Sequence, residues 1–196
     1  MQREANIKRK TGETDITVSL NIDGEGKASI DTGIGFFDHM LTALTKHSGM
    51  DIAISCKGDL YVDGHHSVED VGIALGKAFA EALGDKVGIV RFGFASCPLD
   101  EALASAVVDI SGRAYLVYDC SFAQDKIGEL DSQLVEEFFR AFASNAGITL
   151  HVKCEYGVND HHKAEAMFKS CARALRQATS IDPRFSDQVA STKGVL

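Results

Sequence analysis

Two short motifs in the sequence place a pair of histidines ahead of a glutamate. Residues 65–69 read HHSVE and residues 161–165 read HHKAE, so the same residue types recur at the same spacing. On a helix, residues four apart share a face, whereas adjacent residues point about 100° apart. The two histidines of a motif are therefore poorly placed to chelate one ion together and well placed to serve two ions.

Imidazole and carboxylate ligands without thiolate favour manganese, iron, cobalt or zinc, and coordination above four with room for a substrate favours manganese or iron. A single histidine pair at a helix start is commonly a hydrogen-bonded cap, but its repetition with a glutamate at the same offset favours a metal site. His39, in FFDH, is a further candidate ligand, and Glu137 is its counterpart in the second half. The candidate ligands are His39, His65, His66, Glu69, Glu137, His161, His162 and Glu165.

The motifs belong to a longer internal repeat. Residues 36–58 and 134–157 both begin with the apolar periodicity of a helix, pass a glycine and continue as an alternating strand. A turn, the histidine motif and a long apolar helix follow in each half. A hairpin-like segment precedes each first helix, with turns predicted at Asp23-Gly24 and near Ser111-Gly112.

This order of elements predicts an α+β fold of two duplicated β-β-α-β-α units. We expect the first repeat half in residues 1–95 and the second in residues 96–196, joined in one compact domain. The two units together should form a two-layer domain, a sheet with helices on one face.

Composition limits the classes of function. The chain has 196 residues, a net charge of −8 and 45% hydrophobic residues, which is typical of a globular protein without a basic face for nucleic acid. It has no run of about 18 apolar residues for a membrane span, and its first residues do not resemble a signal peptide. Its five scattered cysteines form no CxxC pair, which indicates reduced thiols in the cytoplasm.

Several longer motifs then point to one family. The chain contains TGIGFFDHML, DGHHSVEDVGIALG, RFG, PLDEAL, DISGRAYL, LVEEFFRAF, NDHHKAEAMFK and STKG. From about residue 3 to the C-terminus it resembles the imidazoleglycerol-phosphate dehydratase family. The resemblance implies a ribosomal protein S5 domain 2-like fold and a hydro-lyase (carbon-oxygen lyase) of L-histidine biosynthesis. Its reaction would remove water from D-erythro-imidazole glycerol phosphate to give imidazole acetol phosphate.

The resemblance also implies cofactors, partners and residue roles. It implies two Mn²⁺ ions per subunit in a cytoplasmic homo-oligomer, a 24-mer with active sites at subunit contacts. One ion would take His66, His161 and Glu69, and the other His65, His162 and Glu165. His39 matches a ligand or substrate-contact position, whereas Glu137 stands where many relatives have a histidine.

The substrate and the catalytic base would use other residues of these motifs. By resemblance, the phosphate would be bound by Arg91, Arg113, Ser191, Thr192 and Lys193, and arginine suits this role because its planar fork binds phosphate bidentately. Glu13, in TGETD, would contact the substrate and act as the base, so the catalytic carboxylates would be Glu13, Glu69 and Glu165.

Three other functions fit part of the pattern. A dinuclear metal-dependent phosphoester hydrolase uses the same kinds of ligand, and release of inorganic phosphate would favour it. A non-catalytic metal store explains the histidines but leaves Arg91, Arg113 and Lys193 without a role. An interaction module of the ribosomal-protein type shares the topology but would need a basic surface.

Overall fold

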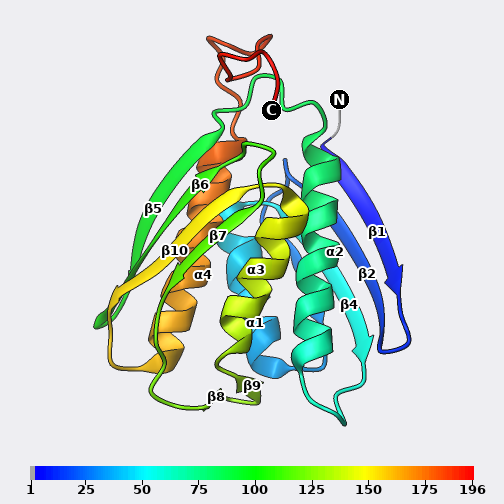
Figure 1. The fold of residues 1–196 in the computed structure, drawn as a ribbon, viewed down its shortest axis with the longest axis vertical. Coiled ribbons are helices and arrows are strands. Elements are labelled where there is room, and N and C mark those ends of the chain that lie inside the picture. The colour runs from blue at the N-terminus through cyan, green and yellow to red at the C-terminus, as the bar shows by residue number, and fades with distance from the viewer. Residues whose placement is uncertain (1–2) are drawn as a thin grey trace.

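The computed structural model describes residues 3–196, and its first half contributes one four-stranded sheet and two helices (Figure 1). In chain order these elements are β1 (Glu4–Lys10), β2 (Thr14–Asn21), β3 (Ala28–Asp31), α1 (Gly35–Ser48), β4 (Asp51–Gly58) and α2 (His65–Leu83).

The second half repeats this order and adds one small hairpin. Its elements are β5 (Phe92–Leu99), β6 (Ala102–Asp109), β7 (Tyr115–Asp119), β8 (Lys126–Ile127), β9 (Leu130–Asp131), α3 (Leu134–Ala146), β10 (Thr149–Tyr156) and α4 (Asp160–Thr179). The duplicated α+β fold is therefore confirmed. The division of the chain after residue 95 stays a prediction.

The two main sheets have equivalent strand orders, β1-β2-β4-β3 and β5-β6-β10-β7. In each sheet the strand after the first helix enters the middle, where it pairs antiparallel with one neighbour and parallel with the other. The two hairpins predicted at Asp23-Gly24 and near Ser111-Gly112 are therefore wrong. A turn signal marks a reversal of the chain, but here β4 and β10, which are apolar on one face, separate the strands on either side of these turns. The actual hairpins join β1 to β2 and β5 to β6.

The two halves pack through their helices. Each sheet carries its two helices on one face, and the halves meet with α1 against α4 and α2 against α3, so the helices fill the space between the sheets (Figure 1). Inward-facing strand residues such as Ile16, Val18 and Val108 are at most 2% exposed, and Phe138 of α3 stacks on Phe168 of α4. This apolar interior holds the helices in fixed positions.

Two glycines of α2 allow an especially close approach of α3. A Cβ atom on Gly72 would lie 2.8 Å from the Cβ of Ala141, and one on Gly76 would lie 2.7 Å from the carbonyl oxygen of Phe142. Any larger residue would push the two helices apart. The contact between the halves therefore depends on backbone lying almost directly against backbone.

All four helices begin at the same end of the molecule, and the described chain ends lie at the other (Figure 1). The β1–β2 and β5–β6 turns lie at the end where the helices begin. Both histidine motifs occupy first helical turns, so the fold brings them to this one end. Within residues 3–196, no helix is long and apolar enough to cross a membrane.

Candidate metal centre

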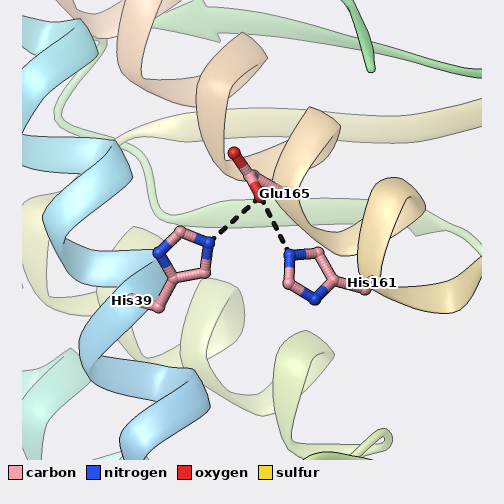
Figure 2. Close-up of side chains that lie close together, drawn as sticks. All are labelled: His39, His161 and Glu165. Carbon is pink, nitrogen blue, oxygen red and sulfur yellow. Dashed lines mark hydrogen bonds and ion pairs between the residues drawn. The ribbon is translucent and has the colours of Figure 1, made fainter. Parts of the chain in front are cut away.

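Three predicted ligands from two helices converge between α1 and α4 (Figure 2). Nε2 of His39 lies 3.1 Å from Oε2 of Glu165, and Nε2 of His161 lies 3.0 Å from the same oxygen. The three ligand atoms lie within 4.8 Å of one another. This spacing of two imidazoles and a carboxylate suits a divalent cation of the manganese, iron or zinc type.

The two oxygens of Glu165 have different partners. Oε1 accepts a charge-assisted hydrogen bond from Lys169 at 2.7 Å, so only Oε2 faces the two imidazoles. Burial would raise the pKa of Glu165, but the Lys169 ammonium and the two imidazoles outweigh it and lower the pKa to about 2. The carboxylate is therefore ionised at neutral pH, as a metal ligand must be.

Phe36 restricts the two imidazole rings from the side. Its ring meets that of His161 edge-on at a centroid distance of 5.1 Å and that of His39 at 6.4 Å. Such packing limits the orientations of both rings before any ion binds.

This grouping differs from the ligand sets that the resemblance implied. His161 and Glu165 were expected on different ions, yet they lie in one cluster with His39. The reason is helical geometry, because residues four apart lie on one face whereas His162 points elsewhere. The rings of His161 and His162 are 6.2 Å apart and inclined at 83°, which confirms the predicted divergence of adjacent histidines.

The fold places an equivalent set between α2 and α3. His65 and Glu69 begin α2 as His161 and Glu165 begin α4, and Glu137 begins α3 as His39 begins α1. Of the described residues, only the cluster around Glu165 has its ligand atoms within 4.8 Å, and Glu137 lies 3.8 Å from Arg140 instead. The second set therefore lies at the same end of the fold, but its ligand atoms are farther apart.

The second histidine of each motif contacts a different carboxylate. Nδ1 of His66 lies 3.0 Å from Asp59, and Nδ1 of His162 lies 2.7 Å from Glu101. These hydrogen bonds are the main reason that the pKa of each histidine is raised above its usual value. Glu13, the predicted base, lies 3.6 Å from Nε2 of His66.

Short polar side chains fix where the motif helices begin. The Asn159 side chain caps α4 by accepting from the backbone N–H groups of His161 and His162 at 2.9 and 3.3 Å. In the first half the N-cap is Gly64, and Asp63, one residue earlier, accepts from the N–H of His65 at 2.8 Å. These contacts hold the histidines in the first turn of each helix.

The predicted phosphate-binding residues meet at the opposite end. The Arg91 guanidinium donates to Asp109 at 2.7 and 3.1 Å and to the carbonyl oxygen of Ala190 at 2.7 Å, so it holds the C-terminal tail that carries Lys193. Arg113 lies 3.8 Å from the same aspartate and its side chain is 70% exposed. Arg113 is therefore the arginine that is free to meet an anion. Ser191 and Thr192 lie beside Ala190 in this tail.

The two groups of predicted site residues are far apart within one chain. The Arg91 N–H donates to the carbonyl oxygen of Ala178, near the C-terminus of α4, whereas His161 lies in the first turn of that helix. At about 1.5 Å per residue the separation along the helix is about 26 Å. A ring and a phosphate joined by three carbons cannot span this distance.

Several residues of these two ends were not identified from the sequence. They are Phe36, Asp59, Glu101, Asp109 and Lys169. Lys169 could have been found, because it follows Glu165 by four residues on a predicted helix. Asp59, Glu101 and Asp109 act across the fold, and only the strand pairing brings them to their partners.

Comparisons with known proteins show the family of the chain. The sequence profile of the imidazoleglycerol-phosphate dehydratase family matches residues 32–175. The enzyme of that name from Gluconobacter oxydans is 59% identical over 194 residues, which cover 99% of this chain and 98% of the relative. The one from Gluconacetobacter diazotrophicus is 61% identical with the same coverage. The crystal structure of the Staphylococcus aureus enzyme has a TM-score of 0.83 and 41% identity, covering 91% of this chain and 99% of that chain.

Proposed function

Since the chain belongs to the imidazoleglycerol-phosphate dehydratase family and is a hydro-lyase of histidine biosynthesis, we propose that it works with two Mn²⁺ ions held by its helix-end clusters. The observation that carries this proposal is the convergence of His39, His161 and Glu165. The first ion would be held by these three residues. The second would be held by the equivalent set, His65, Glu69 and Glu137, while His66 and His162 offer further imidazoles at the same end.

The donor set fits manganese. It offers imidazole nitrogens and carboxylate oxygens without a thiolate, and the side chains of His39 and His161 are 49% and 44% exposed, which leaves them accessible to a substrate. When bound, the ions would supply Lewis-acid stabilisation to the substrate's imidazole ring as it loses a proton. This stabilisation is needed because the substrate carbon that loses hydrogen is not adjacent to a carbonyl and is barely acidic.

The protein's own groups would then complete the elimination. Hydroxide would leave from the carbon attached to the ring, and the Glu13 carboxylate would take the proton from the next carbon to give an enol that becomes the ketone. Glu13 suits this role because its side chain is 53% exposed at the histidine end, 3.6 Å from Nε2 of His66. Glu69 and Glu165 would serve the reaction as metal ligands.

The substrate phosphate would be bound by a neighbouring subunit. Within one chain, Arg113 and the tail residues Ser191, Thr192 and Lys193 lie at the end of the fold opposite the histidines. A single substrate can therefore contact both groups only where two copies meet. This supports a homo-oligomer with active sites at subunit contacts, such as the 24-mer that the resemblance implies.

We place this enzyme in the cytoplasm. All five cysteines are free thiols in the structure, as is usual in a reducing compartment. Neither a membrane nor a nucleic acid is needed as a partner, since the substrate is a small phosphorylated imidazole.

Metal removal tests the first part of the proposal. The full-length protein is stripped with a chelator, and formation of imidazole acetol phosphate is measured before and after Mn²⁺ is restored. Wild type should lose and regain activity, and Glu165→Gln should stay inactive at the same Mn²⁺ concentration. Activity that survives thorough chelation, or release of inorganic phosphate in place of the ketone, would exclude this mechanism.

Mixed assemblies test whether the site is shared. Glu165→Gln damages the histidine end and Arg113→Ala damages the phosphate end, so each variant should be nearly inactive alone. Dissociation and joint reassembly should restore activity, because some contacts then pair an intact histidine end with an intact arginine end. Verified mixed oligomers without any regained activity would show that one chain forms the whole site.

A further inference from the structure

The two halves of the chain orient the second motif histidine with carboxylates from different places. In the first half Asp59, which directly follows β4, contacts Nδ1 of His66 at 3.0 Å. In the second half Glu101, from the β5–β6 turn, contacts Nδ1 of His162 at 2.7 Å. The same contact is thus made from two positions that do not correspond in the repeat.

The repeat identifies the true counterparts. Glu13 directly precedes β2 and Glu101 directly precedes β6, so these two glutamates occupy equivalent positions. Gly58 lies against Thr14 and Ser67 as Gly157 lies against their counterparts Ala102 and Lys163, so the equivalent of Asp59 is Val158. The second half therefore has no carboxylate at the position that the first half uses.

Val158, at the position that corresponds to Asp59, has an apolar side chain that is 82% exposed and cannot accept a hydrogen bond. The carboxylate for His162 must come from elsewhere, and the neighbouring turn supplies it.

The contacts of Glu101 use both of its oxygens. Oε1 accepts from the backbone N–H groups of Val158 and Asn159 at 3.1 and 2.7 Å, and Oε2 receives the contact from His162. The Glu13 side chain accepts no backbone N–H within residues 3–196. The two equivalent glutamates therefore have different surroundings. Glu101 is held by backbone hydrogen bonds, whereas Glu13 is not.

We propose that Glu101 is a positioning residue that holds His162 with its proton on Nδ1 and its Nε2 lone pair free for a metal ion. Glu13 is then the turn glutamate that is available to the substrate. An ionised carboxylate can only accept a hydrogen bond, so the histidine nitrogen that faces it must carry the proton. Neutral imidazole has one N–H, and the other nitrogen becomes the ligand atom. The inference rests on the proposed metal-dependent function and assigns a residue that supports one ligand.

The variant Glu101→Gln should move the proton of His162 from Nδ1 to Nε2 while keeping a side chain of the same size. Its single carbonyl oxygen is needed by the two backbone N–H groups, so its NH₂ group would face Nδ1 of His162 and donate to it. The proton would then move to Nε2, where it blocks the ligand atom. Loss of such a supporting contact typically weakens metal affinity by about 10- to 100-fold.

Two measurements on the full-length protein test the proposal. ¹⁵N magic-angle-spinning NMR of the metal-free protein reads the protonated nitrogen of His162, assigned with His162→Asn, and chelator competition measures Mn²⁺ affinity. We expect Nδ1–H in wild type, Nε2–H in Glu101→Gln and a 10- to 100-fold loss of affinity. Glu101→Ala, which removes the acceptor without adding a donor, should give a mixture of both forms.

Glu13→Gln is the matched control because it changes the equivalent glutamate of the other half. It should leave the proton on Nδ1 of His162, since Glu13 lies beside His66 and does not contact His162. A His162 that keeps Nδ1–H in Glu101→Gln, with unchanged affinity, would overturn the inference. A wild-type protein that does not bind Mn²⁺ would defeat the proposed function instead, and the metal-free spectra would still report on Glu101.

Discussion

A buried ion pair beside the second histidine motif should contribute strongly to stability. Lys163 donates to Asp160 at 2.7 Å, and their side chains are only 10% and 7% exposed. The other oxygen of Asp160 accepts from the backbone N–H groups of Ala123 and Gln124, both at 2.8 Å. The pair therefore joins the loop before β8 to the first turn of α4.

The change Asp160→Asn should lower the free energy of unfolding by about 3 kcal/mol. The asparagine oxygen can still accept from the loop, but its NH₂ group then faces the Lys163 ammonium, which keeps only the carbonyl oxygen of Ser121, at 3.1 Å. Breaking one side of a buried pair costs about 3 to 5 kcal/mol, and this remaining contact argues for the lower value. For a chain of this size the melting temperature should fall by roughly 6 to 12 °C.

The double variant Asp160→Asn with Lys163→Met separates charge from packing. Methionine fills the same space without a charge, so the double variant should unfold within about 1.5 kcal/mol of wild type. Chemical denaturation at equal subunit concentration measures all variants. A cost below about 1 kcal/mol for Asp160→Asn, or a double variant no more stable than the single one, would refute the reasoning.

The sign of the pH dependence follows from the two pKa shifts. Burial would raise the pKa of Asp160, but Lys163 and the two backbone donors lower it below the ordinary 3.8. Asp160 raises the pKa of Lys163 above the ordinary 10.5. The stabilisation is therefore complete between these two values, and is lost as pH falls through the folded pKa of Asp160 or rises through that of Lys163. The difference between wild type and Asp160→Asn should shrink below about pH 4.

Three further changes test other parts of the structure. Gly76→Ala should lower the free energy of unfolding by about 1 to 3 kcal/mol, because its Cβ would lie 2.7 Å from the α3 backbone. Gly35→Ala is the control in thermal unfolding, because a Cβ at Gly35 meets open space and should not show this packing cost. Arg91→Lys loses its planar fork and should speed proteolysis of the C-terminal tail, and unchanged cleavage would contradict its role as an anchor. Lys169→Met should raise the pKa of Glu165 from about 2, which ¹³C NMR of the metal-free protein would follow. An unchanged pKa of Glu165 would show that the imidazoles alone keep that pKa low.

The repeat was readable from the sequence because helix and strand periods are local properties. Apolar spacing around Phe37 and Val135, followed by glycines, located both first helices and the strands after them. Strand pairing was not readable, since β4 and β10 join partners that are distant in the chain. The chain does reverse at Asp23-Gly24, but the strand that follows, β3, pairs with β4 and not with β2.

The candidate site shows the same division between local and distant information. The motif spacing predicted that His161 and Glu165 share a helix face, and it predicted the divergence of His161 and His162. His39 was expected as a ligand, but the spacing did not predict that it would meet His161 and Glu165, because that depends on α1 packing against α4. Nor did it predict the carboxylate partner of His162, which depends on the length of the β5–β6 turn.

The packing of helix on helix between the halves has a consequence for ancestry. One half alone would present the apolar sides of its two helices to water, including the face of α2 whose glycines admit the α3 backbone. A half-length ancestor could cover that face only with a second identical molecule. Gene fusion would then have turned a symmetric pair into one chain, after which each copy of a position such as Glu13 or Glu101 was free to change on its own.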